Sequence, residues 1–95
     1  MINNKYIGLL KEQIKKEKFG KSTKFFIFGS SIKRKKFGDI DIGIIGNVRE
    51  QELRKLEEKF ANSTFPYFVD IIDFNKASKS FTNNVLSNKI LWIKR

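Results

Sequence analysis

The chain has 95 residues, of which 40% are hydrophobic and ten are phenylalanine, so we expect one small ordered domain with a single core. It contains neither cysteine nor histidine, which excludes disulfides, thiolate nucleophiles, imidazole bases and the usual zinc ligands. The formal net charge of +10 favours phosphates, nucleic acid, anionic lipid or an acidic protein as partner, although a lysine-rich surface explains it equally well.

Hydrophobic spacing predicts that helices and strands alternate along the chain. Helices are predicted where apolar residues recur three or four positions apart, and strands where they are contiguous or alternate. Asn3 or Asn4 is expected to cap the first helix. In chain order we predict a helix over about 3–18, a strand over 24–28, a turn or short helix over 32–38, a strand over 39–45, a helix over 48–61, a strand over 67–74 and a final helix containing Phe81, Val85, Leu86, Ile90 and Ile93.

This order, α-β-α-β-α-β-α, predicts an α+β fold in which helices flank a small mixed three-stranded sheet. The first residues lack the contiguous apolar run and the cleavage site of a secretory signal peptide, and no apolar run is long enough to span a membrane. We therefore expect a cytoplasmic protein that forms one domain over residues 1–95 and has no membrane partner.

The four aspartates all lie in two predicted strands, whereas the six glutamates all lie on predicted helices. Aspartate is a poor strand former, so its presence there suggests a role beyond folding. Asp39 and Asp41, two positions apart in a strand, project to the same side. Two neighbouring carboxylates repel each other, and a divalent cation such as Mg²⁺ would relieve that repulsion. The alternative is a solvated strand end.

Asp70 lies within an otherwise apolar strand and would join the pair if the two strands are neighbours. Its alternative role is to pair with one of the many lysines. Asp73, three residues further on, is expected to face away from Asp70 or to lie at the strand end as a turn or cap residue.

Gly29 and Ser30 follow the first predicted strand, where backbone amides can approach phosphate oxygens, and a short helix that starts at Ser30 or Ser31 would add to that affinity. The spacing matches neither a Walker motif nor a dinucleotide-binding motif. The basic run at 33–36 could contact phosphates, attract an acidic or nucleic-acid partner, or be a solvated loop; Lys33 and Arg34 are its best candidates for a phosphate contact.

The segment FGSSIKRKKFGDIDIGI, followed by VDIID, resembles the nucleotidyltransferase superfamily that includes DNA polymerase beta, and in particular its minimal nucleotidyltransferase (MNT) domains. Their signature is an apolar residue before Gly-Ser, a spacer, Asp-x-Asp and a third carboxylate in a later strand. Here Gly29-Ser30, Asp39, Asp41 and Asp70 match it. The spacer is at or just below the usual length, and Ser31 stands where many relatives carry arginine.

The resemblance implies an Mg²⁺-dependent nucleotidyltransferase that transfers a nucleoside monophosphate, AMP from ATP, to a hydroxyl of an acceptor. MNT domains of this size often pair with a HEPN-type toxin, so the implied acceptor is such a protein and the implied role is that of an antitoxin. The resemblance assigns two Mg²⁺ ions to Asp39, Asp41 and Asp70, and the phosphates of the nucleotide to Gly29 and Ser30. We also predict that Ser31, Lys33 and Arg34 bind the nucleotide.

Two alternatives remain open from the sequence. The domain could be a non-catalytic binding module that neutralises a partner by contact. It could also bind nucleic acid, but only the net charge supports that function, because the aromatic residues are mostly expected to be buried.

Overall fold

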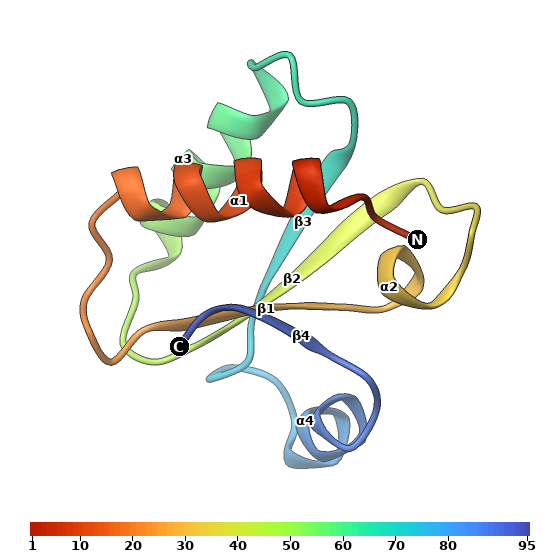
Figure 1. The fold of residues 1–95 in the computed structure, drawn as a ribbon. Coiled ribbons are helices and arrows are strands. Elements are labelled where there is room, and N and C mark those ends of the chain that lie inside the picture. The colour runs from red at the N-terminus through yellow and green to blue at the C-terminus, as the bar shows by residue number, and fades with distance from the viewer.

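Four helices alternate with four strands along residues 1–95, all of which the computed structural model describes (Figure 1). The strands form one mixed sheet in the order β3-β2-β1-β4, in which β2 and β3 are parallel and the other neighbours are antiparallel. The predicted α+β class is confirmed. In chain order the elements are α1 (Asn4–Lys16), β1 (Lys24–Phe28), α2 (Ser30–Lys33), β2 (Asp39–Ile45), α3 (Glu50–Ala61), β3 (Phe68–Asp73), α4 (Lys79–Leu86) and β4 (Leu91–Lys94).

Local signals in the sequence account for most of these boundaries. The Asn3 side chain accepts a hydrogen bond from the Lys5 N–H and so caps α1 as predicted. The predicted bounds of β1 and β2 match the structure. The short helix α2 begins at Ser30, two residues before the predicted turn or short helix over 32–38 and at one of the two serines where a short helix was expected to start. Asp73 is the last residue of β3, at the strand end as expected, and its carboxylate caps the following turn by accepting the N–H of Asn75.

The prediction of a single final helix is wrong in its second half. The helix ends at Leu86, and the chain returns to the sheet as β4, so the sheet has four strands rather than three. β4 pairs antiparallel with β1, placing Trp92 opposite Phe26. The reason is physical: β4 satisfies backbone groups along the outer side of β1 that a longer helix would have left open, and it buries Ile93 in the core.

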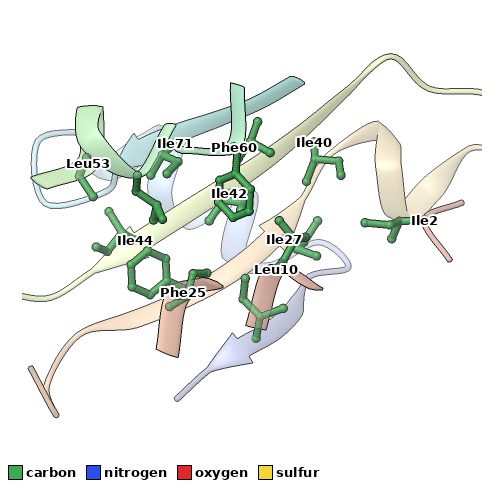
Figure 2. Packing of buried hydrophobic residues seen from close by; sticks show 14 of the residues in the cluster. Ile2, Leu10, Phe25, Ile27, Ile40, Ile42, Ile44, Leu53, Phe60 and Ile71 are labelled. Carbon is green, nitrogen blue, oxygen red and sulfur yellow. The ribbon is translucent and has the colours of Figure 1, made fainter. Parts of the chain in front are cut away.

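Side chains alternate between the two faces of the sheet along each strand, so each face has apolar side chains to bury, and helices cover both faces. In Figure 1, α1 and α3 lie on one side of the sheet and α4 on the other. Figure 2 shows the first side, where Leu10 of α1 and Leu53 of α3 pack with strand residues such as Ile42 and Ile71. On the second side, Phe26, Phe74 and Val85 form a smaller buried cluster beneath α4. None of the helices combines the length and hydrophobicity needed to cross a membrane.

Gly43, in the middle of β2, lies where the aromatic rings of the second side press against the sheet. A Cβ atom there would lie 2.7 Å from Phe26 Cε2 and 2.6 Å from Phe74 Cε1. Gly43→Ala should therefore displace both rings and lower the free energy of unfolding by about 1–3 kcal/mol, as measured by urea denaturation.

Gly8→Ala on α1 is the matched control, because no atom lies within 4 Å of its added Cβ. Alanine is the better helix former, so this variant should gain about 0.5–1 kcal/mol. A Gly43→Ala protein as stable as the parent would show that the aromatic cluster yields to an extra methyl group.

Candidate active site

Three aspartates lie together on the side of the sheet that carries α4. Asp41 of β2 is the register partner of Asp70 on the parallel strand β3, so the two residues are neighbours across the strands. Asp39 lies two residues before Asp41 and therefore on the same face of β2. The structure thus brings together the three carboxylates singled out in the sequence. Asp39 and Asp70 are exposed, and Asp41, between β1 and β3, is half-buried.

The charge of this cluster is not compensated within the protein. Burial raises the pKa of Asp41, and the negative charges of Asp70 and Asp39 raise it further. The five ion pairs in the structure involve glutamates only, so Asp70 is not paired with a lysine. The site therefore carries concentrated negative charge in a protein whose net charge is +10.

Gly29 brings the backbone against this cluster. Its φ of 83° lies in the region that favours glycine, and a Cβ there would lie 2.8 Å from Asp41 Oδ2. Ser30 and Ser31 follow in the first turn of α2, where N–H groups have no partner within a helix. The backbone amides expected to meet phosphates thus begin directly beside the Asp41 carboxylate.

The two serines differ in what they can offer to a ligand. Ser30 is partly exposed, but the Ser31 side chain is fully buried and its hydroxyl has no hydrogen-bond partner. The backbone carbonyl of Ser31 accepts the Ile2 N–H at 2.6 Å. Only the backbone N–H of Ser31 is therefore left to bind a nucleotide as predicted, because the side chain lies in the core.

The basic residues also differ in position: one lines a cavity beside Gly29, and the others lie in the exposed loop. Lys33 lies with Gly29 on the wall of a small cavity of about 70 Å³, whose other side is formed by Asn84, Asn88 and Lys89 at the end of α4. Arg34 and the lysines after it are exposed in the loop that leads to β2. Sequence reasoning missed the three residues from the α4 end, because it treated that segment as the middle of a longer helix.

A larger groove opens on the other side of the aspartates. It has a volume of about 700 Å³, lies between α3 and β3, and includes Asp39 and Asp70 among its lining residues. The sequence carried no signal for this groove, since it depends on β3 being the outermost strand.

The three aspartates fit a magnesium site that a ligand completes. No three acidic side chains converge into a preformed cage for a metal ion. Yet Asp39, Asp41 and Asp70 offer only oxygen donors and lack a counter-ion, and Mg²⁺ typically combines one or two carboxylates with the phosphates of a substrate. The donor set and its uncompensated charge suit such a partly liganded ion.

The raised pKa of Asp41 predicts how metal-free stability depends on pH. The folded state binds this proton more tightly than the unfolded state does, so the stabilisation is full below the ordinary pKa of 3.8 and is lost as the pH rises through the folded pKa. Asp41→Asn removes the loss of stability that accompanies deprotonation of Asp41. Its free energy of unfolding should exceed that of the parent at neutral pH, and the difference should shrink as the pH falls toward 3.8.

Urea denaturation across this pH range, in the presence of a chelator, measures the difference. Glu12→Gln, which replaces an exposed carboxylate on α1, is the reference variant. An Asp41→Asn protein that is less stable than the parent at neutral pH would contradict the account of uncompensated charge.

Comparison with known proteins places this site in a family. The family model described as "Polymerase beta, Nucleotidyltransferase" matches residues 9–95. A search of curated proteins finds no significant match. A crystal structure from Shewanella oneidensis is 26% identical with a TM-score of 0.65, and the match covers 95% of this chain and 72% of the other.

Two further solved structures share the fold. One is a tri-AMPylated Shewanella oneidensis HEPN toxin in complex with an MNT antitoxin, matched at 23% identity and a TM-score of 0.62 over 92% of this chain and 71% of that one. The other is a toxin–antitoxin structure with AMP-PNP, matched at 22% identity and a TM-score of 0.63 over 87% and 71%. With the family model matching nearly the whole chain, this protein belongs to the polymerase beta-type nucleotidyltransferase family.

Proposed function

We propose that this chain is a cytoplasmic, Mg²⁺-dependent nucleotidyltransferase, that residues 1–95 form one catalytic domain, and that it transfers AMP from ATP to a hydroxyl of a HEPN-type toxin and so acts as an antitoxin. The observation that carries the proposal is the uncompensated trio of Asp39, Asp41 and Asp70 beside the Gly29 backbone. The nature of the solved structures supports the choice of substrates, since one contains an AMPylated HEPN toxin and another AMP-PNP.

In the proposed reaction the acceptor oxygen bonds to the α-phosphorus of ATP, the bond from that phosphorus to the pyrophosphate oxygen breaks, and the hydroxyl proton passes to solvent water. Asp39, Asp41 and Asp70 would hold Mg²⁺, which when bound neutralises charge on the phosphates and on the departing pyrophosphate. The family resemblance assigns two ions to these carboxylates.

The remaining residues orient the nucleotide and the acceptor. Gly29 lets the chain approach the phosphates closely, and the N–H groups of Ser30 and Ser31 donate to phosphate oxygens. Lys33, beside Gly29, adds a positive charge on that side, with Arg34 next along the loop. Asp39 and Asp70 are both exposed and line the groove, so they are the carboxylates that the acceptor hydroxyl meets first.

Asp41→Asn tests the carboxylate cluster. Transfer of label from α-labelled ATP to macromolecules in a lysate of the source cells should fall by about 100-fold or more, because charge stabilisation at the phosphates is lost. Transfer by the parent should also stop with EDTA and return with added Mg²⁺. Asp73→Asn is the matched control, since Asp73 is the last residue of β3 and an asparagine there keeps an oxygen for the Asn75 N–H.

Normal transfer by Asp41→Asn would refute the site. If instead the parent transfers no label, yet neutralises the toxin as well as Asp41→Asn does, the protein is the contact-only binding module.

Lys33→Ala tests the phosphate side. The KM for ATP should rise by about tenfold, the effect of losing one charge-assisted hydrogen bond, while the fold stays intact because Lys33 is exposed. Lys36→Ala removes the same charge from the loop that follows α2, outside the cavity beside Gly29, and should leave KM unchanged. Equal effects of the two substitutions would show that only the general positive field of the loop matters.

A further inference from the structure

The outer edge of β3, which lies along the groove between α3 and β3, is covered by side chains at one position and left open at another. β3 is the outermost strand, so its outward N–H and C=O groups have no strand to pair with. At Ile71 the Glu57 carboxylate accepts the N–H at 2.7 Å, and Arg54 donates to the C=O at 3.1 Å. The two side chains are joined by an ion pair of 2.8 Å and together replace the missing strand at this point.

Val69 lies two residues earlier and turns its N–H and C=O to the same side as Ile71 does. No side chain forms a corresponding clamp there, although Val69 lines the groove. Backbone polar groups at a largely buried position need partners. The groove therefore offers one donor and one acceptor to another polypeptide backbone, directly beside Asp70.

The charge of the groove is opposite to that of the protein. Its lining residues include four acidic ones, Asp39, Glu57, Glu58 and Asp70, and only one basic one, Arg54, in a chain with a net charge of +10. Arg54 is already engaged by Glu57. A polyanion such as RNA would be repelled here, whereas a positively charged segment would be attracted.

The groove also offers an apolar contact. Phe68 is 75% exposed, the highest value among the large hydrophobic residues, and it projects from β3 on the same side as Asp70. An exposed aromatic ring at the rim of a groove is a common anchor for a protein partner. The open backbone groups, the acidic lining and the ring all point to one kind of occupant.

We propose that an extended, positively charged segment of the acceptor polypeptide lies in this groove, bonds the backbone of Val69 and so brings its hydroxyl to Asp70. This inference rests on the proposed function for the identity of the acceptor as the partner that receives AMP. The mode of binding is that of a peptide added to a sheet edge, in which backbone hydrogen bonds give affinity and side chains give selectivity.

The test uses a short fluorescein-labelled peptide that alternates lysine with valine around one tyrosine, and a partner peptide with glutamate in place of lysine. Fluorescence anisotropy is measured with the full chain and without ATP, so that binding is scored independently of transfer. The lysine peptide should bind and the glutamate peptide should not. Glu58→Lys and Phe68→Ala should each weaken binding by about tenfold.

Matched controls separate the groove from general effects. Glu12→Lys on α1 changes the net charge as Glu58→Lys does, and Leu86→Ala removes an exposed apolar side chain on α4; neither should alter binding. Amide hydrogen exchange at Val69 should slow when the lysine peptide is added.

Unchanged exchange at Val69, or equal weakening by Glu12→Lys and Glu58→Lys, would overturn the proposal, as would displacement of the peptide by single-stranded RNA. Peptide binding with these properties, but without label transfer from ATP, would refute the proposed function and leave the groove assignment standing. If no peptide binds and label transfer is unchanged in Phe68→Ala and Glu58→Lys, the groove assignment is overturned and the proposed function stands.

Discussion

The register of β2 between its two neighbours is the constraint on which the rest of the structure depends. Asp41 lies opposite Phe28 on one side and Asp70 on the other, so the end of β1, the Gly29 turn and the third carboxylate all meet at one residue. A shift of one residue would turn the aspartates into the core and the isoleucines out of it. Ile40, Ile42 and Ile44 of β2 are fully buried, and their burial therefore holds the polar site in place.

The site imposes a cost that the surrounding core offsets. Three like charges on adjacent strands oppose folding when no cation is present, and Asp41 is half-buried as well. Close packing compensates from both sides of the sheet: the aliphatic cluster under α1 and α3, and the aromatic cluster under α4. Gly43 belongs to this balance, because only a glycine lets Phe26 and Phe74 reach the sheet so close to the carboxylates.

Features that depend on neighbours in sequence were predictable, and features that depend on strand order were not. The Asn3 cap, the bounds of β2 and the shared face of Asp39 and Asp41 follow from local rules of capping and alternation. The short apolar segment that forms β4 is ambiguous between helix and strand, and only the free side of β1 decides it. The groove beside β3 and the burial of the Ser31 side chain likewise arise only from the assembled fold.

The hydrogen bond from the Ile2 N–H to the Ser31 carbonyl ties the chain's first residues to the segment proposed to bind phosphate. Ile2 is buried, and the amino group of Met1 also donates to the Lys35 carbonyl, so the segment ahead of α1 holds α2 at Ser31 and the following loop at Lys35. An unfastened loop would lose conformational entropy each time a phosphate group docked on it. In the proposed function, that entropy is already lost during folding, and the triphosphate would meet a surface whose shape is set before it binds.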